Sequence, residues 1–233
     1  MKRAFGIIVA GGEGLRMNAG GRKQYLMLSG LPILTRTTRA FAASADIAGI
    51  ILVVPEADFA YCRRSVLAFL VTDKPVHLVA AGPHRQASVF NGLSAVCDPE
   101  ATVVIHDGVR PFVSAGHIRQ CIELAEKEGA CSLGVPVSDT VKQVSASGRV
   151  EHTLDRRTLW LAQTPQAFDL AKIRGAHAEA QKSGFRSTDD ASLIEHCGGS
   201  VHMIAGSPWN LKITTPADLQ LAELILQCGL FRD

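Results

Sequence analysis

Glycines and cations stand together near the start of this chain, in a pattern that could bind a polyphosphate. The segment IIVAGGEGLRM, residues 7–17, places three glycines directly after an apolar stretch, with Arg16 just after them and Lys23 six residues beyond the segment. Glycine allows close approach to the backbone, and two nearby cations would attract an anion. A glycine cluster alone more often forms a tight turn. The hypothesis of a phosphate site therefore depends on the two cations.

Further polar groups follow the later apolar stretches. The segment AGPHRQAS supplies Gly82, Arg85 and Ser88, and the segment HDGVRP supplies His106, Asp107 and Arg110. Later segments add Asp139, Thr140 and Lys142, the stretches QTPQ (163–166) and STDDAS (187–192), and Lys212 within NLKIT. In an open parallel sheet, ligands bind beyond the carboxyl ends of the strands. One carboxylate at a strand end, glycine loops and several cations indicate a site for a metal-bound polyphosphate.

Two better-known glycine loops match this segment poorly. A P-loop needs Gly-Lys followed by Ser or Thr, whereas Lys23 follows Arg22 and precedes Gln24. A dinucleotide-binding loop needs a third glycine, whereas Met17 occupies that position. No acidic residue ends the second apolar stretch, residues 49–54, where a ribose partner would be expected. An NAD(P)-dependent oxidoreductase is therefore poorly supported.

Several of these polar residues also have purely structural interpretations. Asp107 taken alone is a candidate helix cap, and His106 is expected to be structural. The TDDAS segment is about equally a helix start, capped by Thr188 or Asp189, and a substrate contact. The eight histidines lack ligand-like spacing and no Gly-x-Ser-x-Gly elbow occurs, which argues against a zinc site and a hydrolase triad.

Apolar stretches alternating with amphipathic ones predict the elements that would position these side chains. Strands are expected at residues 5–10, 49–54, 76–81, 102–107, 131–137 and 200–205. Helical spacing connects Ile118, Cys121, Ile122 and Ala125, and also Leu221, Leu224, Ile225 and Cys228. Strands that are apolar on both faces and alternate with helices predict an α/β fold, with a parallel sheet covered by helices on both sides.

The last predicted helix has a defined start. Thr215 is the expected N-cap, Pro216 occupies the first turn, and Asp218 follows three residues after the cap. These signals predict a helix that begins at residue 216.

One polar segment interrupts the alternation of strands and helices. Residues 138–158 contain a Ser-Ala-Ser-Gly turn and few apolar side chains, which indicates a β-hairpin arm that reaches out from the domain. From composition alone, a solvated loop is about equally well supported.

The bulk composition limits the class of protein. A length of 233 residues suits one α/β domain over residues 1–233, and two small domains fit less well. The net charge of +2, from 24 basic and 22 acidic residues, argues against a nucleic-acid partner. The six cysteines form no C-x-x-C pair, and no stretch of about 18 apolar residues occurs, so we expect a cytoplasmic protein without a membrane span.

The segments quoted above also occur in the order that is typical of one family. AGGEGLRM followed by KQY, then HDGVRPF, SDTVK, LDR, QTPQAF, TDDAS and NLKITTPADL extend over residues 5–226. Over this range the chain resembles the 2-C-methyl-D-erythritol 4-phosphate cytidylyltransferases. The resemblance implies a Rossmann-like nucleotidyltransferase fold, a homodimer and a divalent cation, usually Mg²⁺. It also implies a reaction of CTP with methylerythritol phosphate that gives the CDP-alcohol and pyrophosphate in the non-mevalonate isoprenoid pathway.

The resemblance implies roles for individual positions. Nucleotide contacts are implied for Ala10, Gly11, Gly12, Gly14, Gly82, Arg85, Ser88, Asp107 and Gly108. Arg16 and Lys23 would stabilise charge on the triphosphate, Lys212 would contact the α-phosphate side, and Asp107 would help to hold the metal and the ribose. Residues around the second substrate would be Asp107, Arg110, Thr140, Arg156, Thr164, Thr188 and Lys212, with Arg156 also counted as catalytic. The arm at 138–158 would clasp a partner subunit and carry Thr140 and Arg156 into its site.

Two departures from the family pattern and several alternatives remain. The family usually has proline where this chain has Arg22, which could add a phosphate contact, and HDAARP where this chain has HDGVRP, in which Gly108 keeps the backbone accessible. A sister cytidylyltransferase acting on ribitol 5-phosphate shares most of the motifs, and the chemistry of the residues does not separate the two substrates. More distant alternatives are a sugar-1-phosphate nucleotidyltransferase and a non-catalytic nucleotide sensor.

Overall fold

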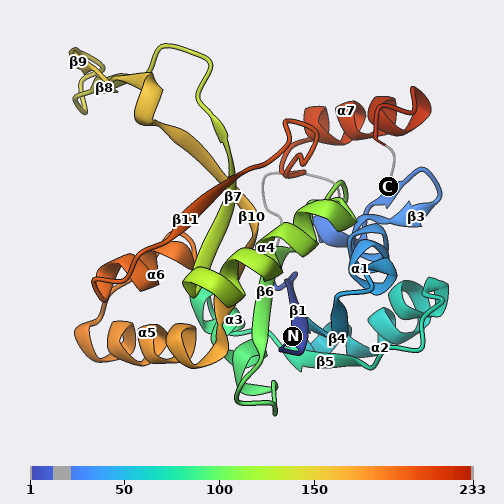
Figure 1. Cartoon of the computed structure of the whole chain (residues 1–233). Helices are drawn as coiled ribbons and strands as arrows, with labels where there is room; N and C mark the ends of the chain where they lie inside the picture. The colour runs from blue at the N-terminus through green and yellow to red at the C-terminus, as the bar shows by residue number, and fades with distance from the viewer. Residues whose placement is uncertain (1, 13–21, 232–233) are drawn as a thin grey trace.

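The computed structural model describes residues 2–12 and 22–231, and a seven-stranded sheet forms its centre (Figure 1). In spatial order the strands are β11 (His202–Ala205), β7 (Ala130–Pro136), β10 (Trp160–Asp169), β6 (Thr102–Asp107), β1 (Ala4–Val9), β4 (Ile47–Val54) and β5 (Val76–Ala80). Strands β1, β4, β5 and β6 are parallel to one another, and β11 is parallel to β7. The predicted α/β fold with a mostly parallel sheet is confirmed.

Strand β10 runs antiparallel to both of its neighbours, β6 and β7. The sequence analysis treated its QTPQ segment as a ligand motif and predicted no strand there. Its middle residues Gln163, Thr164 and Gln166 are polar yet buried, so the apolar pattern that marks the other strands is missing.

Helices cover both faces of the sheet. The α-helices of the described residues are α1 (Ile33–Ala43), α2 (Phe59–Tyr61), α3 (Arg85–Ser94), α4 (Ala115–Glu128), α5 (Leu170–Ser183), α6 (Ala191–His196) and α7 (Pro216–Gln227), of which α7 packs outside the sheet faces. Short helical turns add η2 (Lys23–Tyr25), η3 (Glu56–Asp58), η4 (Cys62–Val66), η5 (Leu67–Phe69) and η6 (Arg156–Thr158). Strands β2 (Met27–Leu28) and β3 (Leu31–Pro32) form a small hairpin before α1.

Alternate residues of the central strands point to opposite faces, and each face has its own apolar core. Ile8 packs on the face covered by α1 and α4, whereas Ile7 packs on the face covered by α3, α5 and α6. A third cluster joins α7, through Ala222 and Ile225, to Val109 in the loop after β6. This third cluster matters for the site because it fixes the loop that follows the central strand β6.

Helix α7 begins as its sequence signals predict. The Thr215 side chain accepts a hydrogen bond from the backbone N–H of Asp218, and the Asp218 carboxylate accepts one from Thr215 in return. This reciprocal pair satisfies two N–H groups at the start of the helix. The Thr215–Asp218 pair also marks the end of the preceding segment, residues 210–214, which contains Lys212.

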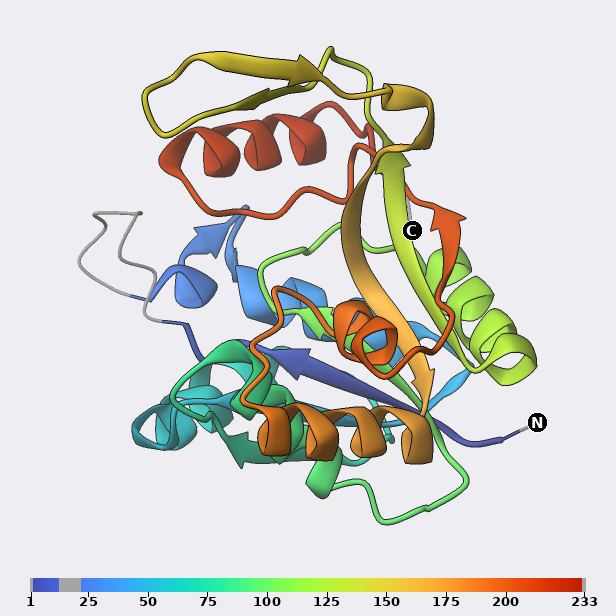
Figure 2. The ribbon, with the colours of Figure 1, turned by 90° about the vertical axis from the view of Figure 1, so that its left-hand side faces the viewer.

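The polar segment at 138–158 forms the predicted hairpin arm. Strands β8 (Lys142–Val144) and β9 (Val150–Thr153) pair antiparallel and project from the ends of β7 and β10 (Figures 1 and 2). Val144 and Val150 are each 53% exposed on it. Among the described residues, no helix is both long enough and apolar enough to cross a bilayer.

Candidate functional site

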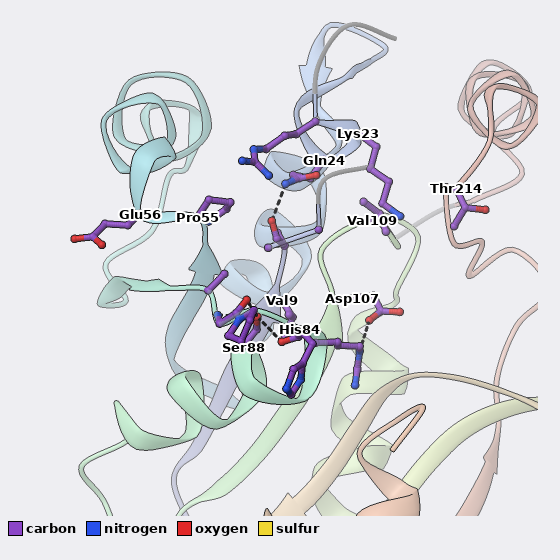
Figure 3. Close-up of a pocket in the computed structure, with 18 of the residues that line it drawn as sticks. Val9, Lys23, Gln24, Pro55, Glu56, His84, Ser88, Asp107, Val109 and Thr214 are labelled. Atoms are coloured by element: carbon purple, nitrogen blue, oxygen red, sulfur yellow. Dashed lines mark hydrogen bonds and ion pairs between the residues drawn. The ribbon is translucent and has the colours of Figure 1, made fainter. Parts of the chain in front are cut away.

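A cavity of about 850 Å³ opens beyond the carboxyl ends of β1, β4, β5 and β6 (Figure 3). The chain runs from β1 to β4 on one side and from β6 to β7 on the other, so the connections after these two adjacent strands lead in opposite directions across the sheet. This is the switch point at which open α/β sheets bind ligands. Of the residues predicted to bind ligand, those that line the cavity are Ala10, Gly11, Gly12, Lys23, Gly82, Arg85, Ser88, Asp107 and Lys212.

Glycines let the loops at this edge approach one another. A Cβ added to Gly11 would lie 2.5 Å from the Ala81 Cβ, and one added to Gly82 would lie 2.5 Å from the Ala87 Cβ. Gly108 is similarly confined, with the Ala10 Cβ 2.8 Å from the position of its missing side chain. Packing between the loops therefore requires glycine at positions 11, 82 and 108, and the approach of a ligand to their backbone stays a prediction.

Ser88 acts mainly as a brace for the loop after β5. Its Oγ accepts the Gly82 N–H at 3.0 Å and donates to the His84 carbonyl at 3.0 Å. The side chain is buried, and His84 caps helix α3 by accepting the Ala87 N–H on Nδ1. These contacts fix the start of α3, whose first residue is Arg85.

Asp107 lies at the centre of a cluster of cations. Its Oδ2 is 2.7 Å from the Lys212 Nζ and 3.6 Å from the Arg110 Nε, and its Oδ1 is 3.3 Å from the Arg85 Nε. Asp107 ends strand β6 and does not cap a helix. Its backbone N–H donates to Thr164 Oγ1 at 3.0 Å, so the neighbouring strand β10 fixes the position of the carboxylate.

The cations keep the Asp107 carboxylate ionised. Burial alone raises the pKa of Asp107, but the charges of Arg85, Lys212 and Arg110 outweigh it and hold this pKa well below its usual range. The three cations outnumber the carboxylates that pair with them, which are Asp107 and, on Arg85, Asp190, so positive charge is in excess beside the cavity. An anionic ligand such as a phosphate would compensate that excess.

Arg85 connects Asp107 to a second buried carboxylate, Asp190. The Arg85 Nη2 lies 2.8 Å from the Asp190 Oδ2, and burial raises the pKa of Asp190 despite this charge. Gln166 on β10 holds the segment, because its Oε1 accepts the backbone N–H groups of Asp190 and Ala191. Asp190 was not among the predicted site residues, although it belongs to the quoted TDDAS segment.

The neighbouring TDDAS residue Asp189 also has the structural role that was considered for it. The Asp189 Oδ1 accepts the Ser192 N–H at 3.1 Å in the first turn of α6. The predicted helix start is therefore present, but the N-cap position of α6 is Asp190 and Asp189, one residue earlier, supplies the side-chain hydrogen bond.

Hydrogen bonds to backbone carbonyls bring Lys212 to Asp107 from a distant part of the chain. Arg110 donates to the Asn210 carbonyl at 2.7 Å, and the Asn210 side chain donates to the Thr164 carbonyl at 2.8 Å. The Ile213 N–H donates to the Val109 carbonyl at 2.9 Å. Arg110 and Thr164 therefore hold the framework of the cluster, and neither lines the cavity itself.

The segment with Lys23 forms the wall opposite the sheet. Gln24 is buried and its Nε2 donates to the Ala10 carbonyl at 2.7 Å, so this segment is attached to the end of β1. Arg22, for which a phosphate contact was considered, has its Nε 3.0 Å from the Asp58 Oδ2. Gly14 and Arg16 lie outside the described residues.

Three predicted substrate residues lie away from the cavity. Thr140, Arg156 and Thr188 are all exposed, and the Arg156 guanidinium donates to the Ser138 carbonyl within the arm at 2.5 Å. The structure of the single chain therefore does not join these three residues to the Asp107 cluster.

The sequence analysis missed one wall of the cavity. Pro55, Glu56 and Ala57, directly after β4, line it. The signal was available, because this segment follows a predicted parallel strand and must lie at the same edge as the other loops. Glu56 stands two residues beyond the strand end at which an acidic residue was sought.

No group of three or more metal-ligating side chains occurs within residues 2–12 and 22–231. A protein site built for zinc or calcium would need such a group. Mg²⁺ instead commonly uses one or two carboxylates together with phosphate oxygens and water. The ionised Asp107 carboxylate on the cavity wall fits that minimal requirement.

A mostly parallel sheet with a glycine-walled, cation-rich cavity at its switch point defines a Rossmann-like protein that binds a phosphorylated nucleotide. Residues 5–228 match the family model described as 2-C-methyl-D-erythritol 4-phosphate cytidylyltransferase. The chain belongs to this family.

Individual relatives agree with the family match. Proteins named 2-C-methyl-D-erythritol 4-phosphate cytidylyltransferase from Pelotomaculum thermopropionicum and Syntrophotalea carbinolica are 42% and 47% identical to it. These alignments cover 97% and 94% of this chain, and 95% and 94% of the relatives. The crystal structure of a 4-diphosphocytidyl-2C-methyl-D-erythritol synthase from Anaerococcus prevotii superposes with a TM-score of 0.86. It is 32% identical, over 97% of this chain and 96% of that one.

Proposed function

We propose that this protein transfers a cytidylyl group from CTP to 2-C-methyl-D-erythritol 4-phosphate, in the non-mevalonate pathway of isoprenoid biosynthesis. The products are 4-diphosphocytidyl-2-C-methyl-D-erythritol and pyrophosphate. Family membership supports the identity of the substrates. The observation that carries the chemistry is the cluster of Arg85, Arg110 and Lys212 around Asp107 at the cavity.

The proposed reaction is a displacement at the α-phosphorus of CTP. An oxygen of the substrate's phosphate forms the new P–O bond, and the bond from the α-phosphorus to the bridging oxygen breaks, so that pyrophosphate leaves with both bonding electrons. The attacking phosphate is already anionic near neutral pH, so no side chain has to remove a proton. His106 agrees with this, because it is fully buried behind the cavity and burial lowers its pKa to about 4.

The remaining difficulty is repulsion between two anions, together with charge that builds on the leaving group. Fixed cations reduce both costs without reorganising during the reaction. We assign Lys23 and Arg16 to the leaving pyrophosphate and Lys212 to the α-phosphate. Arg85 is held between two carboxylates and is therefore assigned to the permanent framework, with Ser88 and Gly82 supporting the nucleotide.

Asp107 is the residue that we assign to a divalent cation, most simply Mg²⁺. When bound, such a cation would neutralise charge on the triphosphate. The other ligands would be phosphate oxygens and water, since the described residues offer no further cluster of acidic side chains beside Asp107.

We further propose that the protein is a cytoplasmic homodimer of single-domain chains joined through the 138–158 arm. Exposed Val144 and Val150 on the arm would then be covered. In such a dimer, Thr140 and Arg156 would reach the methylerythritol phosphate in the partner's site. Neither residue lines its own chain's cavity, which supports this arrangement.

A matrix of substrates tests the proposed function. Purified protein is incubated with Mg²⁺, one of several nucleoside triphosphates, and either methylerythritol phosphate or ribitol 5-phosphate, and pyrophosphate release is followed. We expect release with CTP and methylerythritol phosphate. Release only with ribitol 5-phosphate would establish the sister activity, and tight CTP binding without any turnover would indicate a nucleotide sensor.

A further inference from the structure

The Asp58 carboxylate holds the short segment that carries Lys23. Its Oδ2 accepts a hydrogen bond from the Tyr25 hydroxyl at 2.9 Å and lies 3.0 Å from the Arg22 Nε. Both contacts therefore converge on one carboxylate oxygen. Asp58 itself is fixed to the sheet, because its N–H donates to the carbonyl of Pro55, directly after β4.

The geometry of the turn explains why these contacts orient Lys23. Residues 23–25 form the 3₁₀ turn η2, and Arg22 precedes it with an extended backbone. The Tyr25 N–H donates to the Arg22 carbonyl at 3.0 Å, and the side chains of both residues reach Asp58. The two residues between them must then point elsewhere, and they are Lys23 and Gln24.

Gln24 fixes the turn from a second direction. Its buried side chain donates to the Ala10 carbonyl. Arg22, Lys23 and Gln24 all line the cavity, but the Arg22 side chain pairs with Asp58 and the Gln24 side chain is bonded to Ala10. In Figure 3, Lys23 points toward the side of the cavity where Asp107 and Thr214 lie, away from Glu56.

Tyr25 is well placed to act as a permanent donor in this arrangement. Its ring packs against Tyr61 with the centroids 4.7 Å apart, and burial raises the pKa of its hydroxyl. The hydroxyl therefore stays protonated at neutral pH and can donate to Asp58 throughout the working range of the protein.

We propose that Asp58 is a positioning residue that, through Arg22 and Tyr25, sets the rotation of the η2 turn and thereby directs Lys23 at the bound triphosphate. The inference rests on the proposed function. Asp58 does not line the cavity, so it acts without touching the nucleotide. Arg22 lines the cavity, and its pairing with Asp58 makes it part of this support.

The test combines Asp58→Asn with Lys23→Ala. Asp58→Asn keeps the shape of the side chain but removes the charge that holds Arg22. We expect kcat to fall about tenfold while the KM for methylerythritol phosphate stays unchanged, since a small misplacement of a charged group is costly. In the Lys23→Ala background the same substitution should cause no further loss, because the side chain that it positions is gone.

Asp46→Asn is the matched control, because Asp46 pairs with the exposed Arg119 at 3.1 Å and does not line the cavity. It should leave kcat unchanged. Wild-type kcat in Asp58→Asn, or an equal loss in both Lys23 backgrounds, would overturn the proposal. If Asp58→Asn folds poorly in thermal unfolding, Arg22→Gln replaces it, with an expected loss of about threefold confined to the Lys23 background.

Calorimetric titration with CTP makes the test independent of turnover. Asp58→Asn should weaken CTP binding several-fold when Lys23 is present and leave it unchanged in Lys23→Ala. If the wild-type protein binds CTP but releases no pyrophosphate, the proposed function fails while this binding cycle still decides the role of Asp58. Equal CTP affinity in wild type and Asp58→Asn would refute that role.

Discussion

Replacing Asp107 with asparagine tests whether the cation cluster depends on one carboxylate. Asp107 is 7% exposed, and three cations approach its oxygens at 2.7–3.6 Å. Asparagine keeps the shape but leaves Arg85, Arg110 and Lys212 to repel one another. Turnover should fall as well, because Asp107 is also assigned to the metal and the ribose.

The side chains around Asp107 limit the loss of stability that Asp107→Asn should cause. Removing one partner of a buried ion pair typically costs about 3–5 kcal/mol. Lys212 is 40% exposed and can turn toward water, and Arg85 keeps Asp190, so the loss should lie below that range. We expect the free energy of unfolding at pH 7 to fall by about 2–3 kcal/mol, measured by urea denaturation with an unchanged m-value.

The pH dependence follows from the direction of the shift. The cations hold the pKa of Asp107 below its ordinary value of 3.8, so its charge stabilises the folded state fully above pH 3.8. That contribution is lost as the pH falls through the lower pKa of the folded protein. The difference in stability between wild type and Asp107→Asn should therefore be constant from pH 7 to about pH 4 and shrink below it.

Asp190→Asn is a comparison in which the same chemical change should cost less. Burial raises the pKa of Asp190 above 3.8, so its ionised form costs stability as the pH rises through the folded pKa. Asparagine avoids that cost but removes a partner of Arg85, so stability at pH 7 should fall by less than in Asp107→Asn. An Asp107→Asn protein as stable as wild type at pH 7, or a difference that grows on acidification, would refute the reasoning.

Three further substitutions test other parts of the site. Lys23→Ala should leave the circular dichroism spectrum unchanged and lower kcat by roughly 100-fold, which is the usual effect of losing one preorganised hydrogen-bond donor. Near-normal turnover would show that Lys23 does not have the assigned role. Gly82→Ala places a Cβ 2.5 Å from that of Ala87 and should raise the KM for CTP about tenfold, whereas Gly175→Ala, with open space around it, should not. Thr164→Val leaves the buried N–H of Asp107 without an acceptor and should cost about 1–3 kcal/mol in urea unfolding, whereas Thr164→Ser, which keeps the hydroxyl, should cost less.

The sequence predicted the central sheet well where strands are apolar on both faces. The predicted strand at 102–107 coincides with β6, whose six residues are all buried. The loops after these strands could then be placed at one edge, because parallel strands share the position of their carboxyl ends. Gly11, Gly82, Arg85 and Asp107 were found in this way.

The parts that were missed involve buried polar groups. β10 was missed because Gln166 is buried by hydrogen bonds to Ser132, Asp189 and the start of α6, which no apolar period reveals. Asp58 could not be predicted for a related reason. Its partners Arg22 and Tyr25 are distant in sequence, and only the folded turn brings them together.

The antiparallel course of β10 has a consequence for how the molecule can vary. The chain leaves the sheet after Pro136 and returns at Trp160, and these two residues are direct partners in the β7–β10 ladder. The segment between Pro136 and Trp160 therefore begins and ends at the same position in the sheet, like an insertion between two adjacent strands. Its length can therefore change without disturbing the register of the sheet, whereas Thr140 and Arg156 on it remain constrained by the role proposed for them.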